Sequence, residues 1–208
     1  MPFCLIEDIN FNEVRIAIIQ NNPVSDSDLS FMTEAEKTRF ENFSSEKRKR
    51  EFMGIIRLKN HLFTDEEISY TENGAPYLAN SKKEFISISH SYIYIGIAAA
   101  PFNIGLDIEL ISGKAVKLSP KFMNTQEMLS FDISSPEETT RIWTIKEVIY
   151  KTAGCPGLDF KEDIHVTKES DRYFADVRIE GKWFTTEILT FVKDNYIMSF
   201  NQKALVQK

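Results

Sequence analysis

The chain has 208 residues, of which 42% are hydrophobic and 27% are charged, so it can bury a sizeable core and does not have the composition of a disordered protein. Its formal net charge of −6 argues against general nucleic-acid binding, because contact with the phosphate backbone needs a concentrated basic surface. No apolar run approaches the roughly 20 residues that span a bilayer, and residues 1–8 are acidic where a signal peptide is basic, so we expect a cytoplasmic protein with no membrane or nucleic-acid partner.

The first third of the chain predicts a strand followed by two helices. Residues 13–20 are rich in β-branched side chains and predict a strand that starts the first sheet. From Asp26 to His61 the apolar residues recur at helical spacing, with a break at Ser44-Ser45. The second helix carries a basic cluster that includes Arg50 and Arg57. This cluster is either a solvated helix face or an anion site for a phosphorylated ligand.

A turn and two strands come next. Asn73-Gly74 followed by Pro76 predicts a turn. Residues 85–91 alternate apolar and polar side chains and predict a half-buried strand, and residues 92–100 predict its neighbour. His90 falls at the end of the first of these strands, where it is either a structural hydrogen-bond partner or a phosphate contact.

The second half of the chain predicts two helices and a set of strands. Residues 118–131 are read as a helix that carries Glu127, residues 132–138 as a loop, and a helix around Trp143 ends at Ala153-Gly154. Four further strands are expected at 164–166, 173–179, 183–192 and 196–200. Cys4 and Cys155 lie far apart and are expected to be small buried residues, with no disulfide or zinc site.

The two halves have the same order of elements, namely helices, a turn and antiparallel strands. The stretch 91–96 resembles 194–199 in its polar start and β-rich continuation. We therefore expect an α+β fold of two similar halves, 1–105 and 106–208, packed as an intramolecular pseudo-dimer with mostly antiparallel sheets. Ligand clefts commonly lie at such junctions.

The stretch Asn103 to Glu109 places two carboxylates on one face of a predicted strand, because side chains two residues apart point the same way. Asp107 and Glu109 are joined in our prediction by Glu147 and Lys151 on the helix around Trp143. Three acids and a lysine predict metal-assisted phosphate chemistry. The alternatives are a surface ion pair between Glu147 and Lys151, and edge-strand charges at Asp107 and Glu109.

These residues resemble the Sfp-type 4'-phosphopantetheinyl transferases. The family signatures are Gly-(Ile/Val)-Asp-(Ile/Val)-Glu and Trp-(Ser/Thr/Cys)-x-Lys-Glu-(Ser/Ala)-x-x-Lys, and the chain has matching stretches at 105–109 and 143–151, with Leu106 and Val148 as mild departures. Gly74-Ala75-Pro76 is similar to the family's Gly-Lys-Pro turn, and Ser89-His90-Ser91 to its Ser-His-Ser strand end. The resemblance covers roughly residues 45 to 155.

The resemblance implies transfer of the phosphopantetheine arm of coenzyme A to a serine of an acyl or peptidyl carrier protein, with release of 3',5'-ADP. It implies Mg²⁺, or Mn²⁺ in its place, on Asp107, Glu109 and Glu147, with Glu147 or a metal-held water as the base. Lys151 would sit beside the pyrophosphate, and Lys146 would assist there.

The coenzyme contacts implied by the resemblance come from the first half of the chain. They are Ser89, His90, Gly74, Ala75, Pro76, Arg50 and Arg57. Ala75 replaces the family's lysine, so a contact is lost or shifted there. A role for Glu127 stays open, because acids are common in the first turn of a helix.

Three hypotheses follow. The first is a Mg²⁺-dependent 4'-phosphopantetheinyl transferase, expected to act as a monomer. The second is a non-catalytic member of the same fold that binds coenzyme A or a carrier protein. The third is a metal-dependent phosphohydrolase that uses the same acids without a protein acceptor.

Overall fold

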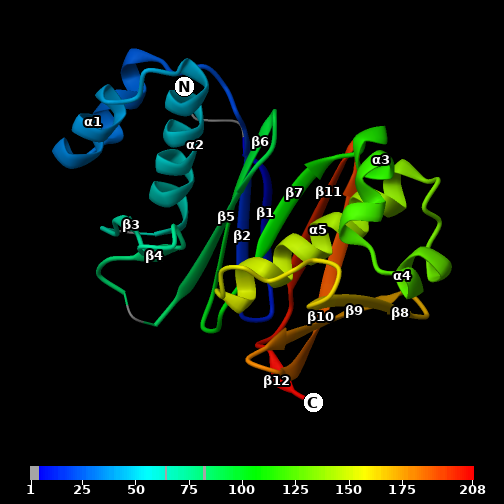
Figure 1. Cartoon of the computed structure of the whole chain (residues 1–208). Coiled ribbons are helices and arrows are strands. Elements are labelled where there is room, and N and C mark those ends of the chain that lie inside the picture. Colours follow the sequence, from blue (N-terminus) through cyan, green and yellow to red (C-terminus); the bar gives the residue numbers. More distant parts are fainter. Residues whose placement is uncertain (1–4, 64, 82) are drawn as a thin grey trace.

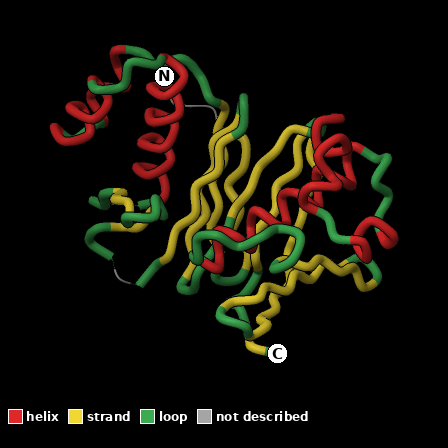
Figure 2. Tube along the Cα trace, in the orientation of Figure 1, coloured by secondary structure: helices red, strands yellow, loops and turns green. Residues whose placement is uncertain are grey.

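The computed structural model describes residues 5–63, 65–81 and 83–208 and contains two antiparallel sheets, each with helices on its outer side (Figure 1). Figure 2 shows the strands together in the middle of the molecule and the helices on its two flanks. This arrangement confirms the predicted α+β fold with two antiparallel sheets.

The first sheet has the strand order β1-β2-β6-β5-β4-β3. Its strands are β1 (Leu5–Phe11), β2 (Val14–Gln20), β3 (Ile68–Tyr70), β4 (Pro76–Leu78), β5 (Phe85–His90) and β6 (Tyr94–Ala100). The 3₁₀ helix η1 (Asp26–Phe31), α1 (Glu34–Glu41) and α2 (Glu46–Leu62) lie between β2 and β3 in the chain. The longest of these helices, α2, packs on β2 and β6.

The second sheet has the order β7-β11-β10-β9-β8. Its strands are β7 (Leu106–Leu110), β8 (Ile164–Glu169), β9 (Arg172–Ile179), β10 (Lys182–Lys193) and β11 (Tyr196–Asn201), and the short β12 (Val206–Gln207) also pairs with β10. The helices α3 (Gly113–Phe122), α4 (Thr125–Ser130) and α5 (Pro136–Ala153) connect β7 to β8. Of the helices in the described ranges, none is both long and apolar enough to cross a membrane.

The two sheets repeat one topology. The order β2-β6-β5-β4-β3 in the first sheet corresponds position by position to β7-β11-β10-β9-β8 in the second, and the helices follow the first strand in both. The resemblance of 91–96 to 194–199 falls on the equivalent strands β6 and β11. The limits 1–105 and 106–208 of the two halves stay a prediction, although the first sheet ends at Ala100 and the second begins at Leu106.

The middle strands are buried on both faces, which explains their almost continuous apolar sequences. In β2, Ile16 and Ile18 pack against the β7 and β11 side chains of the second sheet, whereas Ala17 and Ile19 pack toward α2. The face between the sheets therefore forms one core, and each outer face forms another with its helix.

Several predicted boundaries are wrong for local reasons. The first sheet begins with β1, which precedes the predicted 13–20 strand and forms a hairpin with it. The predicted 118–131 helix is two helices, because Asn124 caps a new helix in a capping box with Glu127. The helix around Trp143 already begins at Pro136, with Ser135 as its N-cap, and ends at Gly154 as predicted. Cys4 lies outside the described residues, and Cys155 is half-buried rather than buried.

Candidate active site

The acidic strand β7 follows a segment that packs very closely on α5. A Cβ atom added to Gly105 would lie 2.1 Å from the Val148 carbonyl oxygen and 2.6 Å from the Thr152 hydroxyl oxygen. The fully buried Asn201 accepts a hydrogen bond from the Gly105 amide at 2.7 Å. Only glycine fits this approach, and it fixes the start of β7 against both α5 and β11.

The other side of β7 is held by serine side chains of β5. Ser87 Oγ accepts a hydrogen bond from the Leu106 amide at 2.9 Å, and Ser89 Oγ accepts one from the Ile108 amide at 3.0 Å. Both serines are buried. The prediction of a half-buried strand implied that the polar face of β5 is exposed to solvent. Instead this face is buried, and its serine side chains accept hydrogen bonds from backbone amides at the edge of β7 that has no neighbouring strand.

Asp107 is a buried carboxylate with one oxygen bonded and the other without a partner. Its Oδ1 accepts hydrogen bonds from Lys151 Nζ at 2.8 Å and from Ser89 Oγ at 3.0 Å. Lys151 also donates to the Leu106 carbonyl oxygen at 2.8 Å. Oδ2 of Asp107 is buried and makes no hydrogen bond. An unsatisfied carboxylate oxygen in a buried position is costly unless a cation binds to it.

Glu109 and Glu147 are half-buried, and the negative charge of Asp107 acts on both of them. Burial raises the pKa of Glu147 to about 7, and the negative charge of Asp107 adds to the shift. The same two causes raise the pKa of Glu109, which also accepts a hydrogen bond from Trp143. The three carboxylates therefore destabilise one another in the charged form, and a bound cation would relieve that repulsion.

This donor set fits a hard divalent cation. No group of three His, Cys, Asp or Glu within residues 5–63, 65–81 and 83–208 forms a ready-made metal cage. Mg²⁺ does not require such a cage, since it usually binds one or two carboxylates and takes its other ligands from water and substrate phosphates. The unpartnered Oδ2 of Asp107 is the first candidate ligand, and the carboxylates of Glu109 and Glu147 are the others.

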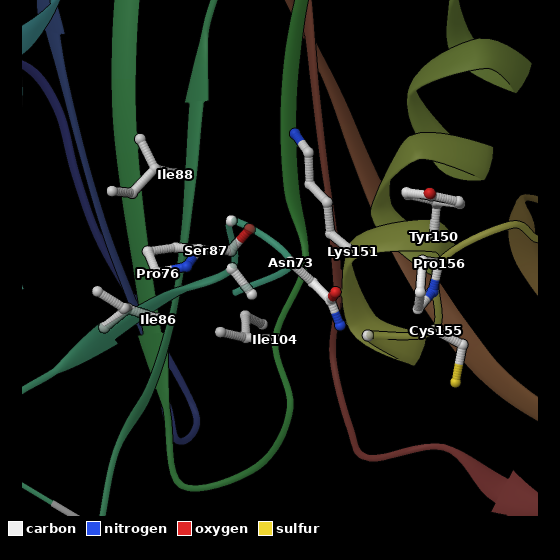
Figure 3. Close-up of a pocket in the computed structure, with 13 residues that line it drawn as sticks. Asn73, Pro76, Ile86, Ser87, Ile88, Ile104, Tyr150, Lys151, Cys155 and Pro156 are labelled. Atoms are coloured by element: carbon white, nitrogen blue, oxygen red, sulfur yellow. The ribbon is translucent and has the colours of Figure 1, made fainter. Parts of the chain in front are cut away.

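A cavity of about 280 Å³ lies between the two halves, and Lys151, which bonds to Asp107, is among the residues that line it (Figure 3). The turn between β3 and β4, with Gly74, Ala75 and Pro76, lines one side of it. Lys151 and the C-terminal end of α5 line the other side. Gly74 has a φ of +80°, so the turn uses the conformational freedom of glycine.

A second cavity of about 290 Å³ adjoins the first, since Gly74 and Pro76 line both. Its charged lining is mainly basic, with Arg39, Arg48 and His90 against the single acid Glu51. His90 Nδ1 lies 3.8 Å from a Glu51 carboxylate oxygen. This cavity suits an anionic group on a ligand whose remainder occupies the first cavity.

Lys146, predicted as catalytic, does not reach the acids. Its side chain is fully buried, and Nζ lies 2.8 Å from a Glu127 carboxylate oxygen and donates to the carbonyl oxygens of Phe160 and Ile164. Burial lowers the pKa of Lys146, and Glu127 opposes that shift. Lys146 and Glu127 therefore hold α5 to α4 and to β8, where the Val166 amide also donates to Glu127 at 2.7 Å.

Two predicted coenzyme contacts also have other partners. Arg57 is buried, and its Nε donates to Asp28 Oδ1 at 3.0 Å, which ties α2 to η1. The Ser89 hydroxyl is occupied by Asp107 and the Ile108 amide. Arg50 is exposed on α2 and does not line the second cavity, whereas Arg48 lines it together with His90. The residue of the basic cluster that lines this cavity is thus Arg48, which the sequence alone did not single out.

Sequence reasoning missed the residues that hold the site in shape. Ser87 was detectable, because it repeats Ser89 at a spacing of two on the same strand face. Thr144 bonds to Ser199 at 2.7 Å, which explains the small polar residue after Trp143 in the second signature. Asn201 gave no local signal, since its bond to Gly105 spans 96 residues.

Comparison with known proteins adds independent findings. The family described as the 4'-phosphopantetheinyl transferase superfamily matches residues 103–200, the segment that carries Asp107, Glu109, Glu147 and Lys151. The chain is also similar to a 4'-phosphopantetheinyl transferase of Bacillus subtilis, with 29% identity over 111 residues. That match covers 47% of this chain and 49% of the relative, so the matched region spans about half the length of the relative.

Proposed function

We propose that the chain transfers the phosphopantetheine arm of coenzyme A to a serine of an acyl or peptidyl carrier protein, starting from the match of residues 103–200 to the 4'-phosphopantetheinyl transferase superfamily. The observation that carries the proposal is Asp107, whose unpartnered Oδ2 lies in a buried cluster with Glu147 and Lys151 at the junction of two halves. Phosphoryl-type transfer depends mainly on such fixed charges around the phosphates.

The coenzyme is proposed to lie across the two adjoining cavities. Its adenine side would meet the turn from Gly74 to Pro76, and its 3'-phosphate would meet His90 and Arg48 in the basic cavity. The pyrophosphate would then reach Lys151, which lines the first cavity and bonds to Asp107. Ala75 offers no cation in this turn, so the basic charge must come from the second cavity.

In the proposed reaction the serine oxygen of the carrier protein attacks the phosphorus that bears the pantetheine arm. A new P–O bond to serine forms, the P–O bond of the pyrophosphate bridge breaks, and 3',5'-ADP leaves. Glu147 is proposed to take the serine proton; its pKa of about 7 describes the site without a cation, and a bound cation would lower that pKa. Lys151 supplies positive charge beside the departing phosphate.

Asp107, Glu109 and Glu147 are the residues proposed to hold Mg²⁺ or Mn²⁺. The cation would offset the charge that develops on the pyrophosphate. The cation would thus offset the repulsion among one buried and two half-buried carboxylates. Cytoplasmic location and a monomeric state are part of the same proposal.

Intact-mass spectrometry tests the function directly. An apo carrier protein incubated with the chain, coenzyme A and Mg²⁺ is expected to gain one phosphopantetheine, and Asp107→Ala is expected to abolish the gain. A panel of fatty-acid, polyketide and nonribosomal-peptide carriers identifies the acceptor. Coenzyme binding with no adduct on any carrier would favour a binding protein, and 3',5'-ADP release with no protein acceptor would favour a phosphohydrolase.

A further inference from the structure

The side chain of Asp107 is held asymmetrically, by one donor from each half of the molecule. Lys151 and Ser89 both donate to Oδ1, and neither reaches Oδ2. Lys151 comes from α5, on the second sheet, and Ser89 comes from β5 in the first sheet. The orientation of the carboxylate therefore depends on the docking of the two halves.

The hydroxyl of Ser89 has a defined donor direction. The Ile108 amide donates to Ser89 Oγ at 3.0 Å, so the serine oxygen acts as acceptor toward β7. Its own proton is then free to point to Asp107 Oδ1, also at 3.0 Å. Ser89 is 4% exposed, so water does not compete for either bond. A hydrogen bond to a charged carboxylate is among the stronger kinds in proteins.

We infer that Ser89 is a positioning residue that holds Asp107 with Oδ2 alone turned toward a divalent cation. This inference rests on the proposed function, because it assumes that the acids bind a cation. A carboxylate on its own rotates easily about its last torsion, and a partial rotation would lengthen both bonds to Oδ1, so the two donors fix the plane of the group. Ser89 thus acts through Asp107 and does not contact the coenzyme.

Ser87 is a matched control within the same strand. It lies two residues earlier on the same face of β5, is equally buried, and accepts a hydrogen bond from the Leu106 amide at 2.9 Å. Unlike Ser89, it has no bond to a carboxylate among the hydrogen bonds of the described residues. Ser87→Ala and Ser89→Ala therefore remove the same kind of edge contact, but only Ser89→Ala also removes a hydrogen bond to Asp107, which then keeps Lys151 as its one donor.

The test is Mn²⁺ binding followed by electron paramagnetic resonance of the free ion, with and without coenzyme A. Loss of an outer-shell hydrogen bond to a metal ligand typically weakens metal binding by about 10–100-fold. We expect Ser89→Ala to raise the Mn²⁺ Kd by that factor and Ser87→Ala to leave it close to the wild-type value. The urea midpoints of the two variants should fall by similar amounts, and Ser89→Cys should give an intermediate Kd and serves if Ser89→Ala does not fold.

The outcomes separate this inference from the proposed function. Equal Mn²⁺ affinities for the Ser87 and Ser89 variants would overturn the positioning role, even if the wild-type chain modifies a carrier protein. Absence of Mn²⁺ binding by the wild-type chain would overturn it as well. If the wild-type chain binds Mn²⁺ but makes no adduct, the transferase proposal fails, and the comparison of Ser89 with Ser87 still decides the positioning role.

Discussion

In the first half of the molecule α2 packs on β2 and β6, and in the second half α5 packs on the equivalent strands β7 and β11. A glycine permits the close approach in both, Gly54 on the helix in the first half and Gly105 before the strand in the second. The charges differ, since the first half has the basic cavity around His90, and the second half has the acids around Asp107. The repeated fold therefore brings a basic cavity and a group of acids to the same junction. This combination suits a ligand that carries phosphates at two places.

In each half a buried ion pair also holds the main helix to a neighbouring helix. Arg57 pairs with Asp28 in the first half, and Lys146 pairs with Glu127 in the second. The Lys146 side chain is 0% exposed, whereas that of Arg57 is 9% exposed. The resemblance suggested ligand or catalytic roles for both cations, but the shared position of these pairs points to a structural role in each half.

The largest expected effect distinguishes the Lys146–Glu127 ion pair from the Arg57–Asp28 ion pair. Lys146→Met leaves Glu127 as an unpaired buried acid and is expected to lower the unfolding free energy by about 3–5 kcal/mol. Arg57→Met should cost less, because the side chains of that pair are 9% exposed, against 0% and 2% for Lys146 and Glu127. Urea unfolding of both variants measures the difference. A Lys146→Met protein with wild-type stability and no transfer activity would instead restore the catalytic assignment.

The second prediction tests the negative charge of Asp107 in the second half. Asp107→Asn keeps the shape of the side chain but removes its charge, and we expect the transfer rate to fall by about 10²–10³-fold. Coenzyme binding through the basic cavity should be retained, which calorimetry with coenzyme A checks in the absence of metal. Asp171→Asn, at an exposed turn, is the matched control. Similar losses in both variants would contradict a special role for Asp107.

A third prediction concerns the pH dependence of stability. The pKa of Glu147 is about 7 in the folded protein against an ordinary value of 4.5, so between these pH values the folded state holds a proton that the unfolded state has released. The unfolding free energy should therefore fall as pH rises from 4.5 to 7 and level off above. Glu147→Gln should reduce this dependence, leaving the part that comes from the raised pKa of Glu109, and stabilise the metal-free protein at pH 8 by about 2 kcal/mol.

Urea titrations in EDTA at pH 5 and pH 8 provide this measurement. Glu162→Gln, at an exposed position, should leave the pH dependence as it is in the wild type. If Glu147→Gln were as pH-dependent as the wild type, burial and the charge of Asp107 would not set the proton affinity of Glu147.

The smallest expected effect lies in the basic half. His90→Ala should weaken coenzyme A binding about tenfold, since it removes one charge-assisted contact to the 3'-phosphate. Dephospho-coenzyme A, which lacks that phosphate, should bind both proteins equally. His165→Ala, on β8 beside Trp183, is the control. Equal weakening for both ligands would place the 3'-phosphate elsewhere.

Local patterns predicted much of the fold. The alternation in 85–91, the capped end of α5 at Gly154 and the β-rich last strands follow from side chains a few residues apart. The strand β1 was missed because its sequence mixes acids with apolar residues, and the break at 123–124 because helical spacing continues across it.

For the site, the two signatures led to Asp107, Glu109, Glu147 and Lys151, and the structure brings Lys151 and the three acids into one electrostatic cluster. Their assignments as ligands and base stay predictions. What the sequence could not supply were partners distant in the chain. Residues a few positions away predict neither the hydrogen bonds between Ser89 and β7 nor the burial of Lys146 against Glu127.

The hydrogen bond between Gly105 and Asn201 has a consequence for how the protein folds. It closes a loop of 96 residues, and β7 gains its hydrogen-bonded neighbour β11 only from that distant part of the chain. Such long-range closures are slow relative to local hairpins such as β1 with β2. The acidic site should thus be among the last parts of the molecule to form during folding, so cation binding would report a completely folded chain.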